Sequence, residues 1–96
     1  MKLKVYSTTE HFMSEGALEE VTTNVFATKE EATEHFKEVA SRIKEATYNN
    51  YQTVGTDDDE ADAVFLEEDN YCEAWESYRA STWNWCIKLT EHEIEL

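Results

Sequence analysis

The chain has 96 residues, of which 41% are hydrophobic and 12% are aromatic, and its formal net charge is −14. Such an acidic surface repels phosphate backbones and anionic lipid headgroups, so the charge disfavours direct binding to nucleic acid or to a membrane. The length predicts a single domain over residues 1–96, and the plentiful aromatic residues predict a folded core instead of a disordered chain.

The N-terminus shows no targeting signal. Residues 1–7 contain two lysines but no apolar segment of a signal peptide, and no apolar stretch approaches the roughly 20 residues that span a bilayer. We therefore expect a cytoplasmic protein. In that reducing compartment Cys72 and Cys86 are expected to be thiols.

Residues 3–27 predict a β-hairpin. β-Branched and aromatic residues favour a first strand over 3–9, and Gly16 favours a turn within 11–17. The second strand is predicted over 18–27. Its alternation places Val21 and Val25 on one side and Phe26 on the other.

A helix is predicted over residues 29–47. Thr28 and Glu31 match a capping box, in which the Thr28 hydroxyl accepts from the Glu31 amide and the Glu31 carboxylate accepts from the Thr28 amide. Glu38 and Arg42 have the spacing of an exposed ion pair on one helix face. The apolar residues recur at intervals of three and four, which is typical of one buried stripe: Ala32, Phe36, Val39, Ala40 and Ile43.

Residues 53–62 predict a solvated acidic loop, and residues 63–96 predict the C-terminal strands, beginning with 63–66. The stretch 71–77 fits two structures. It is either a helix capped by Asn70 or a strand. The strand is the preferred interpretation, because the strongly apolar strand at 83–89 needs a neighbour.

The apolar alternation changes phase near the C-terminus. Trp83, Trp85, Ile87 and Leu89 occupy one phase, whereas His92, Ile94 and Leu96 occupy the other. A one-residue change of phase predicts a bulge or kink near Leu89 and Thr90.

The simplest fold is α+β, with a mostly antiparallel four- to five-stranded sheet packed on one α-helix. A strand ending at residues 25–28, which runs into residues 29–32 and a helix, is followed by acidic strands ending at residues 85–89. This pattern resembles small uncharacterised acidic α+β proteins of bacterial genomes and mobile elements. The resemblance covers most of the chain and implies the fold, but it implies no activity and no site.

Acidic charge is concentrated in residues 53–76, which carry ten acidic side chains and no basic one. Three interpretations compete: a solvated face, a binding surface for a basic partner, and a cation site. The cation site fits poorly, because an EF-hand loop beginning at Asp58 would have Ala63 in place of glycine and Asp69 in place of glutamate. The candidate partner-binding residues are Asp57, Asp58, Asp59, Glu60, Asp62, Glu67, Glu68, Asp69, Glu73 and Glu76.

The cysteines, tryptophans and histidines are the remaining candidates for chemistry or binding. Cys72 and Cys86 would be direct cross-strand neighbours if their hairpin turned about Arg79, but the expected compartment favours free thiols. Trp83 and Trp85 project from one strand face, where core packing is preferred over a protein-binding hot spot. The histidines, His11, His35 and His92, lack the spacing of a zinc site with these cysteines.

Catalytic signatures are absent from the sequence, because there is no nucleophile elbow and two glycines do not make a phosphate-cradling loop. We expect no enzyme, no cofactor and no metal. The predicted function is a non-enzymatic acidic binding protein, of the DNA-mimic inhibitor type, that masks a basic nucleic-acid-binding surface of a partner protein. The alternative is a structural or oligomerising module whose acidic face only confers solubility and which dimerises through Ile94 and Leu96 of the C-terminal strand.

Overall fold

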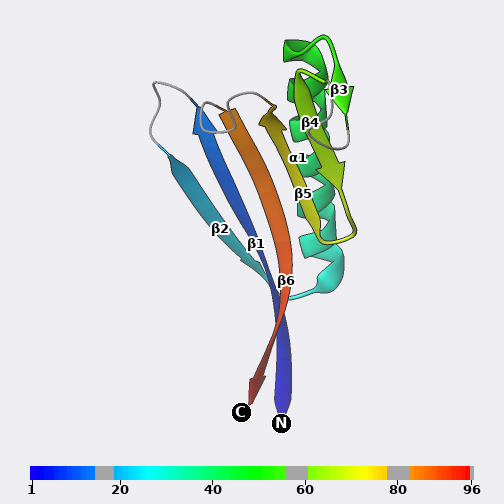
Figure 1. Cartoon of the computed structure of the whole chain (residues 1–96). Helices are drawn as coiled ribbons and strands as arrows, with labels where there is room; N and C mark the ends of the chain where they lie inside the picture. Colours follow the sequence, from blue (N-terminus) through cyan, green and yellow to red (C-terminus); the bar gives the residue numbers. More distant parts are fainter. Residues whose placement is uncertain (15–18, 56–60, 78–82, 96) are drawn as a thin grey trace.

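The computed structural model has an α+β fold, in which one α-helix packs against a six-stranded mixed sheet, and it describes residues 1–14, 19–55, 61–77 and 83–95. The strand order is β2-β1-β6-β5-β4-β3, and both termini lie at the same end of the molecule (Figure 1). The elements are β1 (Lys2–Ser14), β2 (Glu20–Phe26), α1 (Lys29–Asn50), β3 (Val54–Gly55), β4 (Ala63–Glu67), β5 (Tyr71–Glu76) and β6 (Trp83–Glu95).

The predicted fold class is confirmed, but the predicted sheet of four to five antiparallel strands is wrong in detail. The additional strand is β3, which falls in the predicted acidic loop 53–62 and pairs parallel with β4. The Ala63 amide donates to the Thr53 carbonyl at 3.2 Å next to this pairing. Two residues are too few to show the alternation from which strands are predicted.

Strand β1 is longer than predicted. Residues 11–14 were expected in a turn, but they continue the strand because β1 pairs with β2 on one side and with β6 on the other. The ladder with β2 is still regular at Phe12, which faces Glu20. Gly16, the predicted turn residue, lies outside the described residues.

The helix is confirmed where it was predicted and extends three residues further, to Asn50. The Thr28 hydroxyl accepts from the Glu31 amide at 3.2 Å as expected, but the Glu31 carboxylate accepts from the Thr28 hydroxyl instead of the Thr28 amide. At the other end, the Asn50 side-chain amide donates to the Ala46 carbonyl at 2.7 Å. Asn50 therefore supports the last turn instead of breaking it.

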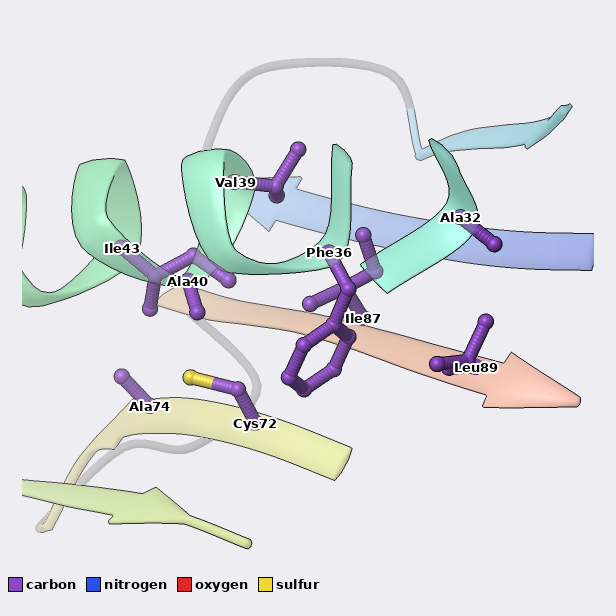
Figure 2. Packing of buried hydrophobic residues seen from close by; sticks show 9 residues of the cluster. All are labelled: Ala32, Phe36, Val39, Ala40, Ile43, Cys72, Ala74, Ile87 and Leu89. Carbon is purple, nitrogen blue, oxygen red and sulfur yellow. The ribbon is translucent and has the colours of Figure 1, made fainter. Parts of the chain in front are cut away.

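The predicted helix stripe is buried and forms one side of the core. The stretch predicted at 71–77 is a strand, as preferred: β5 covers Tyr71–Glu76 and pairs with β6, and its Cys72 and Ala74 belong to the core cluster. Ile43 and Ala40 lie over these two residues (Figure 2). Ile87 and Leu89 of β6 complete the cluster, and Trp83 and Trp85 pack against it as predicted.

The predicted bulge near Leu89 and Thr90 is wrong. β1 and β6 stay in one register over thirteen residues each, from the Lys2–Glu95 pair to the Ser14–Trp83 pair. The apolar side changes because the helix ends: β1 and β6 run beyond α1 as a two-stranded ribbon (Figure 1). Under the helix the apolar residues face α1, whereas in the ribbon Leu3 and Ile94 pair on the opposite face.

The side of the ribbon that continues the helix face is charged. Lys2 Nζ lies 3.2 Å from Glu93 Oε1, and Lys4 Nζ lies 3.9 Å from Glu91 Oε1. Without a helix to cover them, these positions are solvated, and charged residues are tolerated there.

Candidate functional site

The candidate acidic residues that the structure describes lie on the β4–β5 hairpin, which forms one side of the sheet together with β3. Asp62 precedes β4, Glu67 ends β4, and Glu68 and Asp69 form the turn. Residues 61–76 contain no basic side chain. The other four candidates, Asp57, Asp58, Asp59 and Glu60, lie outside the described residues.

The turn of this hairpin places three carboxylates next to one another. Glu67, Glu68 and Asp69 are exposed, and we call them the acidic tip. The Glu68 amide donates to the Tyr71 carbonyl at 2.7 Å, which holds the turn in a defined conformation. The tip borders a shallow hollow against α1 that is lined by Phe36 and Lys37.

Glu73 and Glu76 do not join the acidic tip. Glu73 accepts from the Asn84 side-chain amide at 3.1 Å on the face away from the helix. Glu76 lies at the other end of β5 and accepts from the Tyr51 hydroxyl at 3.4 Å. Both carboxylates are partly buried, so they are committed to contacts within the fold.

Asp62 forms a separate acidic position at the start of β4. Its backbone is held away from the tip by two hydrogen bonds. The Asp62 amide donates to Thr53 Oγ1 at 2.8 Å, and the Asp62 carbonyl accepts from the Ser77 amide at 3.0 Å. Asp62 and Glu67 are five residues apart along the strand, which corresponds to about 17 Å. Because the screening length is about 8 Å at physiological ionic strength, the two ends of the hairpin act as separate negative centres.

Burial, together with nearby carboxylates, raises the pKa of one tyrosine and of both cysteines in this region. Burial, followed by the hydrogen bond and negative charge of Glu73, raises the pKa of Tyr71. Burial, followed by the negative charge of Glu67, raises the pKa of Cys72 to about 12. Burial and then Glu73 also raise the pKa of Cys86. A thiol with a raised pKa is a poor nucleophile at neutral pH, so neither cysteine is suited to catalysis.

The predicted cross-strand pairing of Cys72 and Cys86 is wrong. The register is offset by one residue, so that Cys72 faces Ile87 and Cys86 faces Glu73. A one-residue offset moves a side chain to the other face of a sheet. The two thiols are free, with Cys72 in the core and Cys86 on the opposite face.

The tryptophans are divided between the two faces in the same way. Trp75 pairs with Asn84, so it lies on the face opposite to Trp83 and Trp85. The Trp85 indole donates to Glu10 Oε2 at 2.7 Å, and Phe12 packs edge-on against its ring. These contacts support core packing for Trp85, as the sequence predicted.

The weak EF-hand pattern is excluded by the fold. Five of the residues that would form its loop are in strand β4, Ala63–Glu67, which is hydrogen-bonded to β5. Within residues 1–14, 19–55, 61–77 and 83–95, no group of three or more His, Cys, Asp or Glu side chains is arranged to hold a metal ion.

Two features of possible functional interest were missed by sequence reasoning. Tyr48, beyond the predicted helix end, is 54% exposed and packs edge-on against Phe65 of β4. Ser7 Oγ and His92 Nε2 lie 2.7 Å apart across the β1–β6 pair. No sequence signal pointed to the second contact, because these residues are 85 positions apart and meet only when the termini pair.

The helix that the structure describes is too polar to cross a membrane. Comparisons of the chain with protein-family models, with curated proteins and with solved structures find no match.

Proposed function

We propose that this protein is a non-enzymatic acidic binding protein that uses the β4–β5 hairpin to engage a basic surface of a partner protein. The observation that carries the proposal is the exposed acidic tip, Glu67, Glu68 and Asp69, on a hairpin whose residues 61–76 include no basic side chain. A field of this kind steers basic partners towards the hairpin and raises the association rate.

The acidic tip is the best-supported contact point within the hairpin. Glu67, Glu68 and Asp69 are exposed, whereas Glu73 and Glu76 are partly buried and hydrogen-bonded. Three consecutive exposed carboxylates give this turn a dense negative charge, as the phosphates of a duplex do along its axis. This similarity supports the masking of a nucleic-acid-binding groove as the mode of action.

An exposed aromatic side chain packs on β4 towards the other end of α1 from the tip, which borders Phe36 and Lys37. Tyr48 of α1 contacts Phe65 of β4 at a centroid distance of 6.3 Å and leaves 54% of its surface exposed. Exposed tyrosines are frequent anchors of protein interfaces, whereas rim charges contribute mainly to association rate and salt sensitivity. Tyr48 therefore offers an apolar contact to a partner that reaches beyond the tip along α1.

The test is capture of proteins from source-cell lysate on the immobilised chain, with two charge-matched variants. Glu67→Gln, Glu68→Gln, Asp69→Asn neutralises the tip, and Glu30→Gln, Glu34→Gln, Glu45→Gln removes the same charge from the exposed side of α1. We expect basic nucleic-acid-binding proteins on the wild type and on the helix variant, with their release near 0.5 M salt, where the screening length is about 4 Å. Equal recovery by the tip variant would reject the hairpin as the binding surface.

A further inference from the structure

Strand β2 forms one edge of the sheet. It pairs with β1 through seven residues, and no strand of the described chain lies on its other side. An edge strand presents a row of backbone N–H and C=O groups that only another extended chain can pair in a regular ladder. The backbone of β2 therefore specifies the kind of neighbour that fits it, which is a β-strand.

The β2 edge lacks the devices that usually prevent such pairing. Proteins protect edges with charged residues, prolines, bulges or very short strands. From Val21 to Phe26 the strand has no charged residue and no proline, and its register with β1 is unbroken. At the other edge of the sheet, β3 has two residues and adjoins the acidic hairpin, so that edge is protected.

The side chains of β2 are complementary to a second copy of the same strand. If two copies pair antiparallel about Thr23, then Val21 of each copy faces Val25 of the other on the side away from the helix. These valines are 62% and 69% exposed. Cross-strand pairs of β-branched residues stabilise a ladder, so the pairing gives both valines a neighbour.

The net charge of the chain also favours β2 as the contact between two copies, and it favours antiparallel over parallel pairing. Two chains of −14 repel one another over most of their surfaces, so they can approach closely only where charge is missing. A parallel pairing would place the two Glu20 side chains on neighbouring strands, about 5 Å apart. The antiparallel pairing separates them by six residues, or about 20 Å, which exceeds the screening length.

We propose that β2 is a self-association edge, through which two copies of this chain pair antiparallel about Thr23 and join their sheets. The interaction is independent of the acidic tip, because β2 and the β4–β5 hairpin lie on opposite sides of the sheet. It also differs in its salt dependence. Salt screens the repulsion between the two acidic copies, so salt strengthens the dimer, whereas it weakens the binding of a basic partner.

The first experiment is sedimentation velocity of the full chain over a wide range of protein concentration, at low and at high salt. We expect a concentration-dependent dimer that is tighter at high salt. Thr23→Lys places two lysines opposite each other at the symmetry axis and should weaken the dimer at least about tenfold, although it lowers the net negative charge. Ile94→Lys is the matched control, because it makes the same charge change on the same face, in the β1–β6 ribbon.

The second experiment detects proximity and does not depend on how well Thr23→Lys folds. Thr23→Cys should form a disulfide-linked dimer under mild oxidation, whereas Thr9→Cys, its neighbour on β1 and on the same face, should not. The wild type measures the background from Cys72 and Cys86. A wild type that stays monomeric at all concentrations would overturn the proposal. Loss of the dimer in Ile94→Lys but not in Thr23→Lys would overturn it as well and would assign the contact to the C-terminal strand.

Discussion

The β4–β5 hairpin carries six acidic side chains and no basic one in residues 61–76, whereas β2, at the far side of the same sheet, carries a single charge, Glu20. The two regions also meet the helix differently. Cys72 and Ala74 of β5 are fully buried against α1, but Phe26 of β2 is only partly buried. The hairpin side of the sheet is therefore acidic and firmly packed, and the β2 side carries one charge and is loosely covered.

This difference shows that the net charge of a small protein is a poor description of its surface. A value of −14 suggests uniform repulsion of other acidic molecules, including copies of itself. The distribution of charge gives each edge a different compatible neighbour. The acidic hairpin suits a basic surface, and β2, which has no charged residue from Val21 to Phe26, suits a strand without net charge.

The largest expected effect comes from truncating the core beneath the acidic hairpin. Ile43 is fully buried over Ala74 and Cys72 (Figure 2). We expect Ile43→Ala to lower the free energy of unfolding by about 2–5 kcal/mol, because a cavity remains where the side chain was. Denaturant unfolding measures this loss.

The comparison variant for Ile43 is Val25→Ala on β2. The Val25 side chain is 69% exposed, so its truncation should change the free energy of unfolding of the monomer by less than about 0.5 kcal/mol. Similar losses for the two variants would contradict the contrast between a firmly packed hairpin and a loosely covered edge.

A smaller effect is expected from alkaline pH, through Cys72 of the acidic hairpin. Burial and the charge of Glu67 raise the pKa of Cys72 from 9.0 to about 12. Between these values the unfolded chain loses the thiol proton while the folded chain keeps it, so stability falls as the pH rises. This one group contributes a slope of up to about 1.4 kcal/mol per pH unit.

The free energy of unfolding of wild type and of Cys72→Ala is measured from about pH 8 to about pH 11, the range in which the thiol of the unfolded chain titrates. We expect the variant to lose less stability than the wild type above pH 9.0. Cys86→Ala measures the contribution of the second thiol separately, because burial and Glu73 raise the pKa of Cys86 as well. Identical slopes for wild type and Cys72→Ala would show that the thiol titrates normally.

Local patterns predicted the elements of this fold well. The helix stripe from Ala32 to Ile43 is buried, and Thr28 caps the helix, because both features depend on residues within a few positions of one another. A strand was preferred at 71–77 because the apolar strand at 83–89 needs a neighbouring strand, and the structure pairs β5 with β6.

Features that depend on distant parts of the chain were predicted less well. The apolar phase changes after Leu89 because α1 covers the sheet only up to that point, while β1 and β6 stay in one register. The sequence of β6 alone does not show where α1 lies in space. The one-residue register that separates Cys72 from Cys86 is set by the pairing of whole strands. Likewise, the division of the acidic residues between the tip, Glu73 and the ends of the hairpin follows from the sheet, since alternate residues of a strand point to opposite faces.

The central functional claim is that the acidic tip occupies a groove that otherwise binds nucleic acid. Displacement of a fluorescent DNA duplex from the captured basic proteins tests this claim most directly. We expect wild type and the Glu30→Gln, Glu34→Gln, Glu45→Gln variant to displace the duplex, and the Glu67→Gln, Glu68→Gln, Asp69→Asn variant to displace it poorly. A stable ternary complex, in which partner, duplex and wild-type protein remain together, would show that the tip does not occupy the nucleic-acid-binding groove.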